Sequence, residues 1–517
     1  MIIAETKLPR GIVVLLALFP IFYALLSLAM GQDANWDLKN YHWYNGYAFL
    51  NGRHGFDLLP SQTPYFYNPL LDGAFYAMAS SVPAWVASFV LSALQGMNFI
   101  LLFFLARQVI APKPYRDPAA LLIATLGMLG GGWLAELGTT FYDNLLSLGI
   151  FGSALLALKA HDKTGWRLWI LAGIPVGLAT GIKLPSAIFC VGLCGACFFL
   201  TNTFRQRFTS AFLFGLGVLA GMAITLGFWS WHLWVEYGNP LFPYFNNIFH
   251  SPITLPTSAR DTQFVVEGWA KLTLPFDWTL DPKKVGEVPF RDLKLPLLYI
   301  LLPLALLIGL IKRPAYRQTT PQAGYILAAL AISYICWLFI FSIYRYAVPL
   351  EALAALGLFI ALDHLPFKIK ARQLAFTLIG LLCLATIQIA DWGRISFKDK
   401  FVQADMPPID DPVNTMVLMA GFQPYSHVIP SLPVGMPVIR IQSNFASPGE
   451  PKQINQILKD RVTNWPGKFL LLLPVYDVEW ISREVLPQFG LKTILSDCQI
   501  IEPNFSEPIS LCPVDRL

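Results

Sequence analysis

Repeated apolar runs, most of them close to the length that crosses a bilayer as a helix, constrain this chain more than any other feature of its sequence. A hydrocarbon core about 30 Å thick requires roughly 20 apolar residues of helix. Short polar segments separate the runs, and 55% of the 517 residues are hydrophobic while only 13% are charged. Soluble domains carry charge on about a quarter of their residues. The sequence therefore predicts an α-helical polytopic membrane protein.

About eleven membrane spans are predicted, and several of them are short. Two pairs of neighbouring spans, 168–182 with 184–200 and 324–342 with 346–362, are joined by very tight turns. In the alternative interpretation, each pair forms one long kinked or broken helix, which would change the number of spans. The predicted spans cover residues 12–30, 84–105, 119–135, 143–158, 168–182, 184–200, 211–231, 295–311, 324–342, 346–362 and 373–390.

Basic residues between the spans decide the orientation, because the cytoplasmic loops of membrane proteins carry an excess of Lys and Arg. With the N-terminus inside, every inner segment has at least two basic residues. The long loops 31–83 and 232–294 then lie outside, together with the chain after residue 391. The inner basic residues are Lys7, Arg10, Lys113, Arg116, Lys159, Lys163, Arg167, Arg205, Arg207, Lys312, Arg313, Arg317, Lys368, Lys370 and Arg372.

The chain changes character after the last span, which predicts two domains. Residues 1–394 form the transmembrane domain, and residues 395–517 form a small extracytoplasmic tail. In the tail, short apolar runs alternate with polar helical stretches, a pattern typical of a small α/β domain. The apolar runs are 415–420, 438–441, 469–473 and 493–495, and the helical stretches are 450–463 and 477–488.

Two of the seven cysteines, Cys498 and Cys512, lie in the tail, whereas the other five lie in predicted spans. They are 14 positions apart, and the segments Pro503-Asn504 and Glu507-Pro508 between them favour chain reversal. The predicted topology exposes them to an oxidising compartment if the host is a diderm bacterium. The sequence predicts a disulfide between them, and two unrelated free thiols are the alternative.

The first outer loop contains polar residues that membrane insertion does not explain. Asp37, Tyr41, Tyr44 and Ala48 share one face of a predicted interfacial helix, so an acid stands at its start. An Asp that caps the helix in a solvated loop is the alternative interpretation. The loop ends in an aromatic and proline-rich stretch over residues 64–71, which is predicted to lie on the membrane surface.

Several short motifs follow one another along the chain, and the predicted topology places them all on the outer side. They are Asp37-x3-Tyr41 with Ala48-Phe-Leu-Asn-Gly52, Thr139-Thr-Phe-Tyr-Asp143, Gly177-x3-Gly181-x-Lys183, Gly238-Asn-Pro-Leu-Phe-Pro243 and Arg345-Tyr346. Over roughly residues 10–365 this set resembles the GT-C superfamily, the membrane glycosyltransferases that use polyprenyl-phosphate sugars. That superfamily includes aminoarabinose lipid A transferases and protein O-mannosyltransferases.

The resemblance implies roles for two acids. Glycosyl transfer needs a base that takes the acceptor hydroxyl's proton as the hydroxyl attacks the anomeric carbon, and a partly desolvated carboxylate is suited to this. The resemblance places that role on Asp37 and implies inversion at the anomeric carbon. It implies that Asp143 orients the acceptor, assists the base or holds a divalent metal ion. A cap on the fourth span is the alternative for Asp143, and no metal ligands are assigned.

The leaving group would be a lipid phosphate, which requires cations. Lys183 and Arg345 stand at outer ends of spans, and Arg suits bidentate binding of phosphate. Snorkelling to the interface is their alternative role. Glu351 is expected to pair with one of them, and Asn68 stands where many relatives of the superfamily carry a basic residue. The predicted substrate-binding residues are Tyr41, His42, Asn68, Lys183, Arg345, Tyr346 and Glu351.

These observations predict an inverting glycosyltransferase in a bacterial cytoplasmic membrane, with its active site and tail on the periplasmic side. Its partners would be the bilayer, a polyprenyl-phosphate monosaccharide and a lipid, glycan or protein acceptor. A flippase for lipid-linked glycans is disfavoured because nearly all polar residues lie at outer span ends rather than at mid-span. A ligase or polymerase finds weak support in Arg260 and Arg291 of the second loop. The small, dispersed net charge of +5 gives no basis for binding nucleic acid.

Overall fold

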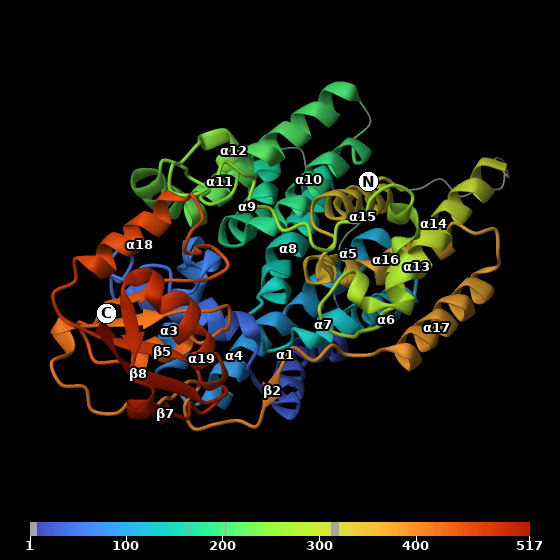
Figure 1. Ribbon diagram of the computed structural model, residues 1–517. Coiled ribbons are helices and arrows are strands. Elements are labelled where there is room, and N and C mark those ends of the chain that lie inside the picture. The colour runs from blue at the N-terminus through green and yellow to red at the C-terminus, as the bar shows by residue number, and fades with distance from the viewer. Residues whose placement is uncertain (1–7, 163–164, 202, 312–319) are drawn as a thin grey trace. The chain divides into compact units, whose positions relative to one another are not determined.

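The computed structural model describes residues 8–162, 165–201, 203–311 and 320–517, and its helices and strands are labelled in Figure 1. Helices predominate before residue 390. Among the described residues, every β-strand of more than two residues follows residue 414, in one 6-stranded sheet. Five basic residues of the orientation argument lie outside the described residues: Lys7, Lys163, Lys312, Arg313 and Arg317.

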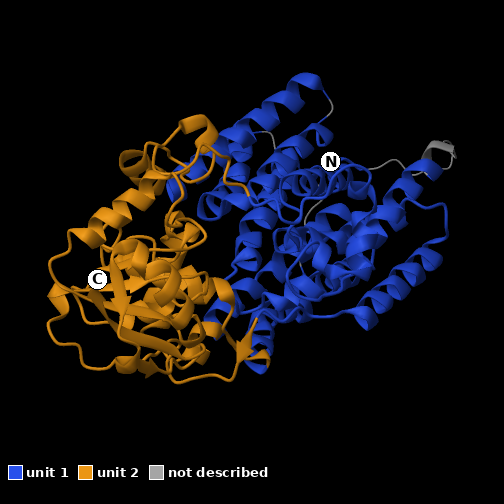
Figure 2. Ribbon diagram, viewed as in Figure 1, with its two compact units in different colours: residues 1–29, 89–226, 261–392 blue, residues 30–88, 227–260, 393–517 orange. Residues whose placement is uncertain are grey.

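The chain divides into two compact units, which Figure 2 shows in different colours. Unit 1 consists of residues 1–29, 89–226 and 261–392 and contains most of the long apolar helices. Unit 2 consists of residues 30–88, 227–260 and 393–517. Unit 2 therefore combines the first predicted outer loop and part of the second with the tail.

Seven helices among the described residues are long and apolar enough to cross a membrane. Each overlaps a predicted span, so the prediction of a polytopic helical membrane protein is confirmed. They are α1 (Arg10–Met30), α4 (Ala84–Gly96) continued by α5 (Asn98–Val109), α8 (Asp143–Asp162), α11 (Phe204–Tyr237), α15 (Pro321–Ile340), η6 (Tyr344–Ala347) continued by α16 (Val348–Asp363), and α17 (Ile369–Thr386).

The other four predicted spans are also helical, but their helices are shorter or interrupted. The predicted span 119–135 is divided into α6 (Arg116–Met128) and α7 (Gly131–Ala135). Both tightly joined pairs are broken at non-helical residues, at Lys183 with φ −138° and at Ser342 with φ 51°. The remaining helices are α9 (Trp166–Ile182), η3 (Leu184–Ser186) with α10 (Ala187–Ala196) and η4 (Cys197–Phe199), and α14 (Lys294–Ile311).

Helices α9 and α11 approach each other closely because α9 presents glycines to its neighbour. A Cβ at Gly177 would lie 2.2 Å from the carbonyl oxygen of Val218, and one at Gly181 would lie 2.1 Å from the hydroxyl of Thr225. Small residues spaced four apart allow this approach in membrane helices. The Gly177-x3-Gly181-x-Lys183 motif therefore has a packing role, and it fixes the end of α9 from which Lys183 extends.

The tail is a small α/β domain, as predicted. Its sheet has the order β4-β3-β5-β8-β6, in which β3 is parallel to β4 and β5, while β8 is antiparallel to β5, β6 and β7. Three predicted strands are confirmed, the run 493–495 is only partly strand, and the last two strands were not predicted. The strands are β3 (Thr415–Met419), β4 (Val438–Arg440), β5 (Lys468–Pro474), β6 (Leu491–Thr493), β7 (Gln499–Ile501) and β8 (Ile509–Arg516).

The predicted helical stretches of the tail are also present. Residues 453–463 form α18 (Gln453–Thr463), whose apolar side chains are buried against the sheet. Residues 478–489 form a continuous helical segment of α19 (Val478–Trp480), η10 (Ile481–Val485) and η11 (Leu486–Phe489).

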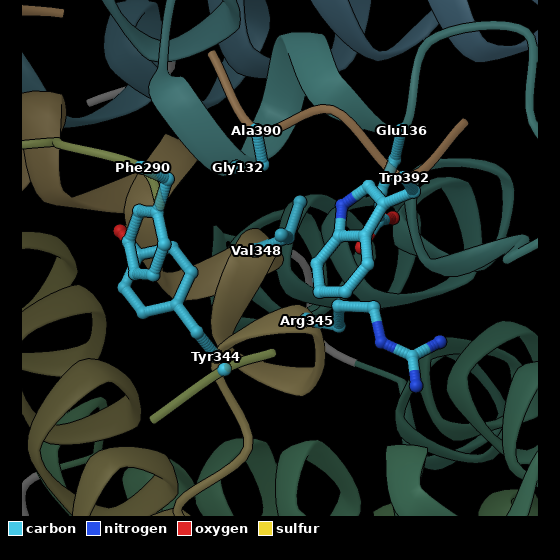
Figure 3. A pocket seen from close by; sticks show the side chains of 9 residues that line it. Gly132, Glu136, Phe290, Tyr344, Arg345, Val348, Ala390 and Trp392 are labelled. Atoms are coloured by element: carbon cyan, nitrogen blue, oxygen red, sulfur yellow. The ribbon is translucent and has the colours of Figure 1, made fainter. Parts of the chain in front are cut away.

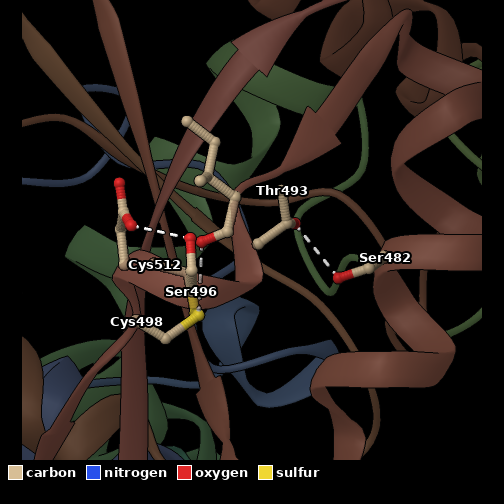
Figure 4. Close-up of a disulfide and its surroundings, with 7 residues drawn as sticks. Ser482, Thr493, Ser496, Cys498 and Cys512 are labelled. Carbon is tan, nitrogen blue, oxygen red and sulfur yellow. Dashed lines mark hydrogen bonds between the residues drawn. A yellow bond between two sulfur atoms is a disulfide. The ribbon is translucent and has the colours of Figure 1, made fainter.

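The predicted disulfide is confirmed and is shown in Figure 4. The sulfur atoms of Cys498 and Cys512 are 2.01 Å apart, and the two α-carbons are 4.1 Å apart. Cys498 directly precedes β7, and Cys512 is a fully buried residue of β8. Gln499 pairs with Leu511 in the antiparallel sheet, so Cys498 and Cys512 are the next two residues that face each other.

Removing this bond with Cys498→Ser is expected to destabilise the C-terminal strands. A loop of this size corresponds to about 3 kcal/mol in the chain-entropy model. Hydrogen exchange of the amides of β7 should therefore accelerate relative to that of β3. Cys336→Ser, which removes a free thiol in α15, is the control and should leave β7 exchange unchanged. Equal protection of β7 in both variants would contradict a stabilising bond.

Within unit 2 the first long loop, residues 31–83, packs on the edge of the tail's sheet. Leu58 joins β4, because its N–H donates to the Val438 carbonyl at 2.9 Å and its carbonyl accepts from the Arg440 N–H at 2.9 Å. At the beginning of the loop, β1 (Gln32–Asp33) pairs with β2 (Arg394–Ile395). The tail thus anchors the loop that contains Asp37 at two separate places.

Candidate functional site

Asp37 stands at the start of the predicted interfacial helix, which the structure forms as a π-helical turn, η1 (Leu38–His42), followed by α2 (Trp43–Leu50). Its side chain makes no capping hydrogen bond to this turn. The Tyr41 hydroxyl, one turn along the same face, donates to Asp37 Oδ2 at 3.3 Å. The half-buried carboxylate therefore has a side-chain partner, and the capping interpretation does not describe it.

His42 is held by an acid that the sequence analysis did not single out. Its Nδ1 lies 2.6 Å from Oδ1 of Asp72, in the first turn of α3 (Leu70–Ala79), and both side chains are buried. Gly46 permits this contact between helices, because a Cβ there would lie 2.4 Å from the Asp72 carbonyl oxygen. The Asn68 side chain accepts a hydrogen bond from the Leu70 N–H at 3.0 Å, at the start of α3.

In unit 1 the structure brings two predicted residues together, Asp143 and Lys183. Lys183 Nζ donates to Asp143 Oδ2 at 2.6 Å and to the Phe141 carbonyl at 2.8 Å. Asp143 begins α8, and Tyr142 before it has φ 66°. A bulky residue in the left-handed region is uncommon, and such residues cluster at functional sites. The strained turn aims the carboxylate at the ammonium rather than along its own helix.

The second predicted cation, Arg345, lies in the same part of unit 1. Its guanidinium carbon is 4.3 Å from the centroid of the Phe141 ring and 5.3 Å from that of the Trp392 ring. Lys183 Nζ in turn lies 5.2 Å from the centroid of the Tyr346 ring. The aromatic faces attract both cations and provide semi-rigid walls around them.

The expected pairing of Glu351 with Lys183 or Arg345 is wrong. Its carboxylate accepts from the N–H groups of Gly132 and Trp133 at 3.1 and 3.0 Å and from the Tyr344 hydroxyl at 2.7 Å. Its cationic neighbour is Lys294, at 4.0 Å. The first N–H groups of a helix lack partners within it and favour an anion. The fully buried carboxylate of Glu351 is the acceptor for these N–H groups of α7. Its predicted role in substrate binding stays a prediction.

A small pocket opens beside Arg345, and Figure 3 shows the side chains around it. It is partly open, and its space of about 10 Å³ is close to the room that one water-sized group requires. Apolar and aromatic side chains form most of its wall, and the polar groups include the carboxylate of Glu136, which the sequence analysis left unassigned. The lining residues are Gly132, Glu136, Gly286, Phe290, Tyr344, Arg345, Val348, Ala390 and Trp392.

Glu136 follows α7 directly and lies between the predicted third and fourth spans. Burial raises the pKa of its carboxyl well above the ordinary value, and the nearby charge of Asp143 raises it further. The positive charges of Lys183 and Arg345 act in the opposite direction on this pKa. The charge of Glu351 also raises this pKa, so unit 1 places three carboxylates and two cations in one electrostatic group.

No group of three or more His, Cys, Asp or Glu side chains suited to a metal ion occurs in the part of the chain that the structure describes. Asp143, the predicted candidate for a metal, pairs with a cation. Its suggested role as a metal ligand stays a prediction.

The long apolar helices with the α/β tail define the class of this protein: a polytopic helical membrane protein with a small α/β domain. Residues 69–231 match the family described as dolichyl-phosphate-mannose-protein mannosyltransferase, which is a GT-C family. The matched segment includes Asp143 and Lys183, and it supports a glycosyltransferase of the GT-C type. The resemblance found in the sequence is confirmed. No curated protein matches the chain.

Proposed function

We propose that the protein transfers a monosaccharide from a polyprenyl-phosphate donor to a lipid, glycan or protein acceptor. The reaction takes place at the outer face of the cytoplasmic membrane and inverts the anomeric carbon. The observation that carries this proposal is the grouping in unit 1 of Lys183 and Arg345 around Phe141 and Asp143. Two cations held at the ends of apolar helices suit a ligand that is both anionic and lipid-soluble.

The two cations have different tasks. Arg345 presents a planar guanidinium that suits two oxygens of a phosphate, and the rings of Phe141 and Trp392 hold its plane. Lys183 acts as a point charge whose position depends on Asp143. In the transfer step the bond between the anomeric carbon and the phosphate oxygen breaks, and the cations stabilise the charge that develops on the leaving phosphate.

Asp37 is the base in this proposal, as the superfamily resemblance implies. It accepts the proton of the acceptor hydroxyl while the hydroxyl oxygen bonds to the anomeric carbon. Tyr41 supports it, because a hydroxyl that donates to Oδ2 orients the carboxylate. The anchoring of the first loop to the tail supports a precise placement of this acid.

Replacing either cation is expected to weaken donor binding more than it slows sugar transfer from donor that is already bound. Lys183→Ala and Arg345→Ala should each raise the Kd for a short-chain polyprenyl phosphate by roughly 10- to 100-fold, the effect of losing a hydrogen bond to a charged group. Calorimetric titration of purified protein measures this. Arg372→Ala, which breaks an ion pair with Asp363 on the predicted inner side, is the control. Unchanged Kd in both test variants would mean that the phosphate binds elsewhere.

A further inference from the structure

Glu136 carries a buried carboxylate for which the described residues provide no hydrogen-bond donor. The residue is 1% exposed, and neither Oε1 nor Oε2 accepts a hydrogen bond from any described group. Burial of an unpartnered carboxylate is strongly unfavourable, so buried polar groups in folded proteins nearly always have a partner. A carboxylate of this kind, facing a pocket, marks a place where a ligand supplies the missing partner.

The surroundings of Glu136 restrict what that ligand can be. Arg345, the proposed phosphate-binding cation, lines the same pocket. The pocket is partly open, and the space within it admits a water-sized group such as one hydroxyl. Trp392 and Phe290 provide flat apolar walls beside the polar groups. A few convergent polar groups among aromatic side chains are typical of sites that recognise small polar ligands.

A hydroxyl group fits these restrictions better than a phosphate or an ammonium group. A phosphate would be repelled by an ionised Glu136, and an ammonium group would pair with it only in the ionised form. A hydroxyl both donates and accepts, so it can bond to the carboxyl in either protonation state. Because a hexose carries several hydroxyls within a few ångströms of its phosphate, one of them can reach Glu136 while the phosphate binds Arg345.

We infer that Glu136 forms a specificity subsite that binds one hydroxyl of the donor sugar, beside the Arg345 position that binds the donor phosphate. This inference rests on the proposed function and extends it, since it assigns recognition of the sugar to a residue at the C-terminal end of α7. Glu351 positions the subsite indirectly, because it holds the N-terminus of the short helix that Glu136 follows. The subsite distinguishes a sugar conjugate from the bare lipid phosphate.

The test compares two kinds of probe on the full chain in lipid nanodiscs. The first is a set of short-chain polyprenyl-phosphate mannose, glucose and galactose, and the second is the same polyprenyl phosphate without a sugar. Glu136→Met keeps the approximate length of the side chain and removes both carboxyl oxygens, so that it cannot bond to a hydroxyl. The control is Asp117→Asn, at an acid of α6 that pairs with Arg107 of α5. The Kd of each probe is measured, and a thermal unfolding curve establishes that each variant is folded.

Glu136→Met should raise the Kd of the tightest-binding sugar conjugate by roughly 10-fold or more and should not raise the Kd of the bare phosphate. Unchanged affinity for that conjugate, or an equal loss for both kinds of probe, would overturn the subsite. If Glu136→Met fails to fold, Glu136→Asp, which withdraws the carboxylate by one methylene, is judged by the same criterion. Failure of the wild-type protein to bind any of the conjugates would instead contradict the proposed function.

Discussion

Asp37→Asn is expected to reduce sugar transfer by roughly 10²- to 10⁴-fold, the usual cost of losing a general base. An amide has the size of the carboxylate but cannot take the acceptor's proton. The Tyr41 hydroxyl can still donate to the oxygen of the substituted amide, so the local structure should persist. The measurement is the initial rate of transfer by purified protein from a short-chain polyprenyl-phosphate sugar.

The control for this variant is Asp405→Asn, which removes an exposed carboxylate from the tail. Both proteins should be obtained in equal yield and elute identically in size-exclusion chromatography. Transfer by Asp37→Asn above about a tenth of the wild-type rate would contradict the assignment of Asp37 as the base.

The second large effect is expected at Arg53, whose guanidinium forms a two-contact ion pair with Asp57. Its Nε and Nη2 lie 2.6 and 2.7 Å from the two carboxylate oxygens, and the Asp57 side chain is fully buried. Asp57 also accepts from the Tyr44 hydroxyl and from the Val438 N–H of β4, each at 2.9 Å. The pair therefore links the first long loop, residues 31–83, to the sheet of the tail.

Arg53→Met should destabilise unit 2 by about 3–5 kcal/mol, because it leaves a buried carboxylate without its cation. Hydrogen exchange of the Val438 amide should accelerate by at least about 100-fold. The double replacement Arg53→Met with Asp57→Asn removes both charges and should restore much of the protection. Equal exchange rates in the wild type and Arg53→Met would show that the pair does not hold the loop on the sheet.

Much of the helical architecture could be predicted, because apolar run length is a local property of the sequence. The seven long apolar helices overlap predicted spans, and the order of strands and helices in the tail follows from short-range patterns. The strand β8 was missed although it pairs with three others. Its residues 509–516 contain Pro513, and a proline within a run argues against a central strand.

The chemistry-bearing residues could be predicted singly but not as a set. Asp143 and Lys183 were both identified, but their ion pair depends on a left-handed turn at Tyr142 and on close packing of α9, which no local pattern specifies. The pairing of Glu351 with Lys183 or Arg345 was expected because all three residues stand near predicted outer span ends, and it is wrong. In the structure Glu351 caps α7, and that short helix is recognisable only once the predicted third span is seen to break.

Glu136 and Asp72 were missed for a related reason. Each is an acid next to an apolar segment, and only tertiary structure shows that Glu136 is buried without a partner among the described residues while Asp72 binds His42. The sequence signal was proximity: Glu136 precedes the Thr139–Asp143 motif by three residues, and Asp72 follows the aromatic stretch of the first loop.

The most direct test of the central claim is the lipid-linked sugar content of cells that lack the protein. Mass spectrometry of lipid extracts should show accumulation of a polyprenyl-phosphate monosaccharide in the deletion strain. The wild-type gene should reverse the accumulation, and the gene encoding Asp37→Asn should not. An unchanged level of every polyprenyl-phosphate monosaccharide, or accumulation only of a longer glycan on a lipid pyrophosphate, would contradict the proposed transferase.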